Sequence, residues 1–360
     1  MSKPDHAILA AVMSAKTLAD LLGGDASDAN VRKLRTQIHP DRFGGDDSAW
    51  RKLDDLLAAA RGPVVLPPPT FVPLELRAGK TTYLLESVLA HGGVADLYAT
   101  MHGDVPAVAK VAGDPRDNDL LLAEATALRV VRAKPRTSPG LDHLLPSLLD
   151  TFEVRSGGAR RRVNIISRAS TMKASPDPAY VTLAQVRAAY PDGLDFRDAA
   201  WIIRRMLAAI GLAHSRGYVH GAVLPHHMLV HPTEHDALLV DWCYAVPTGS
   251  KGRAVVAAHR DAYPPEYLAK DPLGPQADIY MLGRCAAYLL ARAGFETHAD
   301  AWAHDGIPRA VIAFVRGMLI ANPRRRSADA WELHETFGNV LEDVVGPPRF
   351  RVLAMPPAAP

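Results

Sequence analysis

The stretch that decides the fold reads Tyr218-Val219-His220-Gly221-Ala222-Val223-Leu224-Pro225-His226-His227-Met228-Leu229-Val230, and Leu239-Val240-Asp241-Trp242-Cys243 follows it. Short β-prone runs predict strands at 228–231 and 237–241. The surrounding sequence has helical periodicity. The helices that we expect in this half of the chain cover 183–190, 197–217, 276–293, 308–320 and 327–343. This half is therefore predicted to be mainly helical, with a small strand pair that ends on an acidic residue.

The preceding segment has a different period. Five short β-prone runs, several of them separated by glycines, predict strands at Thr82–Val88, Asp96–Thr100, Ala107–Val111, Thr151–Val154 and Arg162–Ser167. One helix is expected among them, at Leu120–Val131. Lys110 lies on a predicted strand and Glu124 on this helix. Such a Lys and Glu can pair inside a cleft and hold phosphate groups.

Taken in order and spacing, these residues resemble a eukaryotic-type protein kinase fold over roughly 80–345, with a β-rich amino-terminal lobe and a helical carboxy-terminal lobe. The resemblance implies a nucleotide site and four structural residues. The nucleotide candidates are Gly92, Gly93, Lys110, Glu124 and Asp241, and the structural candidates are His220, Glu266, Asp278 and Arg326. The fold class expected from the resemblance is α+β.

The sequence departs from the kinase pattern at the residues that transfer phosphate. Ala222 stands where the resemblance places the catalytic Asp, and a methyl group accepts no proton from a substrate hydroxyl. The other substituted positions are Ala90, Ala95, Gly221, Leu224, His227 and the pair Trp242-Cys243. We therefore expect a pseudokinase and no confident catalytic residue. ATP or ADP with Mg²⁺ stays open as a ligand, and His227 with Asp241 is the candidate metal pair.

A second motif lies near the amino terminus. Residues 1–62 are expected to form helices at 7–22, from Asp28 to Pro40, and after Ser48. His39-Pro40-Asp41 stands at the turn between the last two helices, and Arg32, Lys33 and Arg35 make the preceding helix basic. About residues 15–62 resemble the J domain of co-chaperones. By that resemblance, these six residues would contact the ATPase of a heat-shock chaperone.

Clumped prolines divide the chain. Three consecutive prolines at 67–69 cannot enter a helix or a central strand. We expect a J-like domain at 1–62, a Pro-rich linker at 63–79, a kinase-like domain at 80–345 and a Pro-rich tail at 346–360.

Composition limits the remaining classes. The 360 residues include 48% hydrophobic and 22% charged residues and carry a formal net charge of +2, which is ordinary for a globular protein and argues against a dedicated nucleic-acid binder. No apolar run is long enough for a membrane span, and no signal peptide is recognisable. The only two cysteines, Cys243 and Cys285, form no disulfide framework, so a cytoplasmic location is expected.

Three hypotheses follow from these observations. The first is an adaptor in which the J-like module recruits a heat-shock chaperone and the degraded kinase-like domain binds an unknown protein client. The alternative is an atypical kinase or nucleotidyl transferase that uses Lys110 and Asp241, with His227. In the third, the J-like hairpin serves only as a packing element on the second domain.

Overall fold

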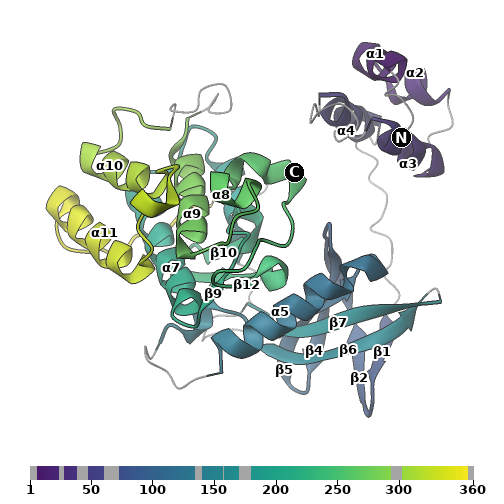
Figure 1. Ribbon diagram of the computed structural model, residues 1–360, viewed down its shortest axis with the longest axis horizontal. Helices are drawn as coiled ribbons and strands as arrows, with labels where there is room; N and C mark the ends of the chain where they lie inside the picture. The colour runs from purple at the N-terminus through teal and green to yellow at the C-terminus, as the bar shows by residue number, and fades with distance from the viewer. Residues whose placement is uncertain are drawn as a thin grey trace. The chain divides into compact units, whose positions relative to one another are not determined.

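The computed structural model describes residues 6–23, 28–38, 48–60, 73–133, 140–156, 158–169, 180–292 and 302–355. The chain divides into two compact units, Met1–Thr70 and Phe71–Pro360 (Figure 1).

The first unit has four helices among its described residues: α1 His6–Ser14, α2 Leu18–Leu22, α3 Asp28–Gln37 and α4 Ser48–Ala60. The single helix expected at 7–22 is wrong, because Thr17 adopts an extended conformation and forms a capping box with Asp20, which begins a new helix. Gly23 ends α2 in the left-handed region, as the sequence indicates. The buried core of this unit contains Val12, Leu18, Ile38, Ala49 and Leu53. His39, Pro40 and Asp41 lie outside the described residues.

The second unit begins with β-structure. Its main sheet is antiparallel with the order β3-β4-β5-β7-β6, formed by β3 Ser87–His91, β4 Ala95–His102, β5 Val105–Ala112, β6 Leu148–Ser156 and β7 Ala159–Ser167. Helix α5, Asn118–Val131, packs on one face (Figure 1). Successive side chains of β5 point to opposite faces of the sheet. Ala107 and Ala109 therefore belong to one buried core, whereas Val108 and Ala112 belong to the other.

A hairpin of β1 Leu74–Ala78 and β2 Thr81–Leu85 covers the face opposite α5. The expected linker at 63–79 is therefore wrong at its carboxy-terminal end, because β1 lies inside that range. Leu76, Tyr83 and Leu85 are its buried side chains, and Leu76 pairs with Tyr83 across the turn. After Pro73, apolar side chains alternate with exposed ones, and this pattern allows the hairpin to pack its apolar face on the main sheet.

The rest of the second unit is mainly helical. Its helices are α6 Leu183–Ala189, α7 Phe196–His214, α8 Pro265–Leu268, α9 Pro275–Leu290, α10 Arg309–Met318 and α11 Ala330–Val345. Small sheets join β8 Val181–Thr182 to β10 Met228–His231 and β11 Asp236–Leu239, and β9 Tyr218–Val219 to β12 Val246–Pro247. The described residues thus form a mixed α and β chain, compatible with the expected α+β class, with the largest buried cluster around α7 and α9.

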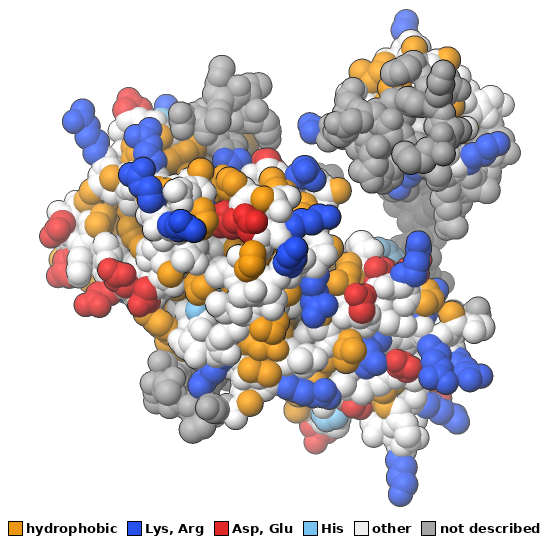
Figure 2. Space-filling view, in the orientation of Figure 1, with side chains coloured by type: hydrophobic (Ala, Val, Ile, Leu, Met, Phe, Trp, Pro, Cys, Tyr) orange, Lys and Arg blue, Asp and Glu red, His pale blue; other side chains and the backbone are white. Residues whose placement is uncertain are grey.

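The surface carries both signs of charge. Figure 2 shows basic side chains over α10 and acidic side chains over α11, next to one another on the same face. No described helix combines the length and the apolar character that crossing a membrane requires.

Candidate functional site

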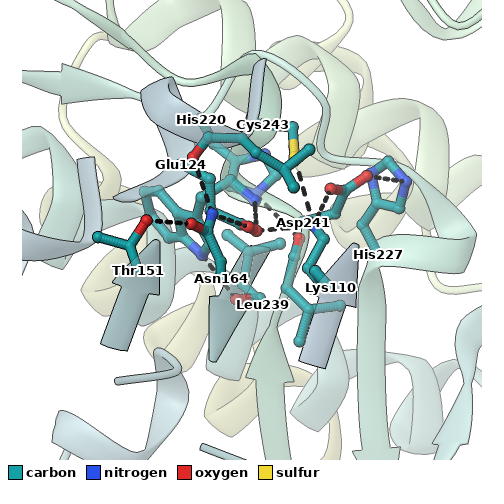
Figure 3. A network of polar contacts seen from close by, with 12 residues as sticks. Lys110, Glu124, Thr151, Asn164, His220, His227, Leu239, Asp241 and Cys243 are labelled. Carbon is teal, nitrogen blue, oxygen red and sulfur yellow. Dashed lines mark hydrogen bonds and ion pairs between the residues drawn. The ribbon is translucent and has the colours of Figure 1, made fainter. Parts of the chain in front are cut away.

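Lys110 is the centre of a buried charge network. It lies on β5 on the same face as Val108 and Ala112, and its Nζ donates to Glu124 Oε1 of α5 at 2.7 Å (Figure 3). The same Nζ donates to Asp241 Oδ1 at 2.7 Å and to Cys243 Sγ at 3.3 Å. All three ammonium protons therefore have a partner within the protein.

Asp241 reaches the ammonium from just beyond β11. Its backbone has φ 64° and ψ 64°, in the left-handed region that non-glycine residues rarely occupy. The residues after it, Trp242–Tyr244, turn at once into a short 3₁₀ helix. This turn brings Cys243 back toward Lys110, so one short segment supplies two of the three ammonium partners.

Glu124 is oriented by groups that the sequence did not single out. Asn164 Nδ2 donates to Glu124 Oε2 at 3.0 Å and to the Leu121 carbonyl at 2.8 Å, and Asn164 Oδ1 accepts from Thr151 Oγ1 at 2.8 Å. The backbone N–H of Trp242 also donates to Glu124 Oε1, at 3.3 Å. Each carboxylate oxygen of Glu124 therefore accepts a hydrogen bond from an uncharged group, in addition to the ion pair with Lys110.

Burial and neighbouring charges set the ionisation of this network. Burial opposes the charge of Lys110, but Asp241 and Glu124 outweigh it and hold the pKa of the ammonium well above its usual value. Burial likewise acts to raise the pKa of Asp241, yet Lys110 and His227 bring that pKa below its usual range. Burial raises the pKa of the Cys243 thiol. At neutral pH the network is an ammonium between two carboxylates and a thiol.

One group of possible metal ligands is found among the described residues: Glu124, Asp241 and Cys243. Their ligand atoms all lie within 4.8 Å of one another. Lys110 Nζ lies 2.7, 2.7 and 3.3 Å from those atoms. The ammonium therefore fills the position that an ion would take, and this group does not fit a metal while Lys110 is charged.

The sequence-predicted metal pair is brought together. His227 Nε2 lies 3.1 Å from Asp241 Oδ2, and His227 Nδ1 lies 2.8 Å from the Ala222 carbonyl oxygen. The two ring nitrogens of His227 therefore contact oxygen atoms of two different segments. His227 thus joins the loop at Ala222 to the acid that follows β11.

The loop containing Ala222 is held from α9. Asp278 accepts from the backbone N–H groups of His220 and Gly221 at 2.7 and 2.9 Å, and His214 Nε2 lies 2.9 Å from it. His220 Nε2 contacts the Val240 carbonyl at 3.1 Å, and burial lowers its pKa to about 4. His220 is therefore neutral at pH 7 and serves to join the loop to β11.

Gly221 and Ala222 carry no functional side chain in this loop. Gly221 has φ 75°, and a Cβ there would lie 2.8 Å from the Tyr244 carbonyl oxygen. Ala222 and Leu224 are both fully buried. A side chain at 221 would therefore strain the backbone, and position 222 presents only a buried methyl group.

Two further predicted residues form a buried pair away from this loop. Arg326 Nη1 donates to Glu266 Oε1 at 2.6 Å and to the Gln276 carbonyl at 2.7 Å. This pair joins the start of α8 to the segment before α11.

The two candidate glycines occupy a tight hairpin turn between β3 and β4. The Gly92 N–H donates to the Ala95 carbonyl at 3.0 Å, and a Cβ at Gly92 would lie 2.6 Å from that oxygen. The Val94 carbonyl accepts from Gly113 at 2.9 Å, which fixes the turn to the end of β5. Turn geometry alone therefore requires a glycine at 92.

In the first unit, Arg35 and Lys33 of α3 differ in their contacts and their exposure to solvent. Arg35 Nη2 pairs with Asp54 of α4 at 2.5 Å, and its guanidinium lies over the Trp50 ring, so it joins α3 to α4. Lys33 is exposed. Arg32 belongs to α3, but its side chain lies outside the described set.

Comparison with known proteins agrees with a kinase-like region. No protein-family model matches the chain. Over 96 residues, 26% of this chain, it is 29% identical to calcium/calmodulin-dependent protein kinase type 1 of Caenorhabditis elegans. The match spans 28% of that relative's length. Part of the chain is therefore similar to a protein kinase.

Proposed function

We propose that this protein is an adaptor in which a catalytically inactive, two-lobed protein-kinase-like domain binds a protein partner and a J-like module recruits a heat-shock chaperone ATPase. The observation that carries the first half is Ala222, a buried methyl group at the position where the kinase resemblance expects the proton acceptor.

The kinase-like interpretation is supported by the contacts of residues far apart in sequence. Lys110 pairs with Glu124 and Asp241, Asp278 holds the loop at His220, and Arg326 pairs with Glu266. The local similarity to a protein kinase points in the same direction.

Among the described residues around Ala222, the histidine and the acid that could replace the acceptor are already paired. His220 is fully buried and hydrogen-bonded, and Asp241 is paired with Lys110 and His227. Gly221 and Leu224 supply no charge for a transferred phosphoryl group, so stabilisation of a phosphoryl-transfer transition state is weak as well.

The chaperone half of the proposal rests on His39-Pro40-Asp41 and on the exposed Lys33 of the preceding helix. The test is the steady-state ATPase of a bacterial and of a eukaryotic cytosolic heat-shock chaperone of the 70-kDa class, with and without this protein. We expect stimulation by the wild type, loss of stimulation by His39→Gln, and full stimulation by the matched control His91→Gln, which alters an exposed histidine of β3. Equal stimulation by His39→Gln and wild type contradicts the proposal.

Nucleotide binding is the second candidate function, favoured by the intact network around Lys110. Mg²⁺ would be held by Asp241 and His227, and it would neutralise phosphate charge there. The Asp241 carboxylate suits Mg²⁺, which prefers oxygen ligands, whereas His227 Nε2, 3.1 Å from Asp241 Oδ2, would bind a cation only as an unprotonated nitrogen.

A thermal-shift titration with ATP and MgCl₂ tests this second candidate. A specific site predicts a rise in melting temperature that saturates and is lost in His227→Ala. A melting temperature that does not respond to millimolar ATP rejects nucleotide binding, and with it the atypical kinase or nucleotidyl transferase.

A further inference from the structure

The carboxy-terminal segment that follows α11 packs against the rest of the second unit. Its described part, residues 346–355, contains no helix or strand. It contacts three separate places in the fold: the residue after α6, the start of α7, and the turn between β10 and β11.

An arginine provides the polar contact. Arg351 Nε and Nη2 donate to the two carboxylate oxygens of Asp198, at 2.9 and 3.0 Å, and Asp195 lies 3.6 Å from Nη2. Asp195 caps α7 and Asp198 is in its first turn. The fork-to-carboxylate geometry is specific for arginine, since a lysine cannot donate two parallel bonds.

Leu353 provides the apolar contact. Its side chain is 2% exposed, although the adjacent Val352 is 57% exposed. The Leu353 N–H donates to the Pro232 carbonyl at 3.1 Å, and the Tyr190 hydroxyl donates to the Ala354 carbonyl. One side of the segment is therefore inserted while the other faces solvent.

An aromatic stack completes the surface. His235 lies between Trp201 and Phe350, with ring centroids 4.4 and 4.3 Å away, and its Nε2 donates to the Arg351 carbonyl. His235 holds this position with φ 53°, a conformation that costs free energy and persists only where contacts impose it. Phe350 itself is 65% exposed, so it covers the stack from outside.

The Arg351 and Leu353 side chains, at alternate positions, contact the body, and backbone groups of Arg351, Leu353 and Ala354 add hydrogen bonds. This combination is typical of a bound peptide. We propose that the surface formed by Tyr190, Asp198, Trp201, Pro232 and His235 is a peptide-binding site for an aromatic–Arg–X–Leu segment, and that Phe350–Leu353 of the same chain occupy it. The proposal is independent of the kinase-like and chaperone interpretations.

The test uses the full chain with a protease recognition site inserted after Gly346. After cleavage, a fluorescent peptide of residues 347–360 is added and its anisotropy is followed. We expect saturable binding to the cleaved chain, competition by the unlabelled peptide, and much weaker binding to the uncleaved chain, whose own segment competes.

Two variants make the test specific. Asp198→Asn in the chain, or Arg351→Ala in the peptide, should weaken binding about tenfold, because each removes a partly exposed charge-assisted pair. The swapped combination, Asp198→Arg with Arg351→Asp, should recover part of the loss. Circular dichroism of the cleaved chain monitors folding.

Three results would overturn the proposal. The first is a folded, cleaved chain that has lost its tail and binds no peptide. The second is a tail fragment that never exchanges with added peptide. The third is a body that unfolds once the tail is released, since the segment would then be part of the fold rather than a ligand.

Discussion

Replacing Lys110 with methionine removes the cation that two carboxylates share and keeps most of the side-chain volume. Glu124 would then be a fully buried carboxylate with no counter-ion, close to Asp241. Breaking a buried pair in this way costs about 3–5 kcal/mol. Glu124 keeps its bonds from Asn164 and Trp242, so we expect the lower end, about 3 kcal/mol of unfolding free energy.

The assay is urea unfolding at pH 7, with Lys80→Met as the matched control, because Lys80 is exposed at the β1–β2 turn. The control should stay within about 0.5 kcal/mol of wild type. In a thermal melt, 3 kcal/mol corresponds to roughly 5 °C for a unit that spans Phe71–Pro360, because the entropy of unfolding is about 2.1 cal/mol/K per residue. Adding Glu124→Gln to Lys110→Met should recover stability, because it removes the uncompensated charge.

The loss should also depend on pH in a defined direction. In wild type the folded-state pKa of Asp241 is depressed, so its contribution is present above the unfolded value of about 3.9 and lost as pH falls through the folded value. In Lys110→Met, burial without the ammonium raises that pKa, so the deficit should shrink between pH 7 and pH 4. A deficit below about 1 kcal/mol at pH 7 would refute the role of Lys110 as the shared counter-ion.

Two other predictions concern the backbone and the sheet. Gly221→Ala should cost about 2 kcal/mol more than Gly217→Ala in urea unfolding, because both glycines have positive φ but only the new Cβ at 221 meets the Tyr244 carbonyl; equal losses would contradict this steric argument. Tyr83→Phe should destabilise the protein by about 1–2 kcal/mol, because the hydroxyl donates to Asp150 Oδ2 at 2.8 Å and joins the β1–β2 hairpin to the main sheet. Hydrogen exchange should then quicken first in β1 and β2, and unchanged exchange there would count against the hairpin's attachment through this bond.

Much of the second unit could be predicted because its signals are local. The strand expected at 228–231 coincides with β10, and the expected helix Leu120–Val131 lies within α5. The closeness of Lys110 to Glu124 and Asp241 was expected from resemblance, since nothing in the spacing of 14 and 131 residues along the chain shows it.

The partners that complete the site could not be predicted. Asn164 and Cys243 are ordinary residues in sequence, and their roles depend on which strand lies beside β5 and how the chain turns after Asp241. The β1–β2 hairpin did leave a signal, the alternation of Leu76, Tyr83 and Leu85, but its position next to a proline cluster favoured a linker.

The central claim, that the kinase-like domain transfers no phosphate, is tested most directly with γ-labelled ATP, Mg²⁺ or Mn²⁺, and basic and acidic acceptor proteins. The account predicts that the wild type incorporates no more label, into itself or the acceptors, than Lys110→Met does. Label transfer by wild type that Lys110→Met abolishes would contradict the claim and establish an enzyme that works without a carboxylate at position 222.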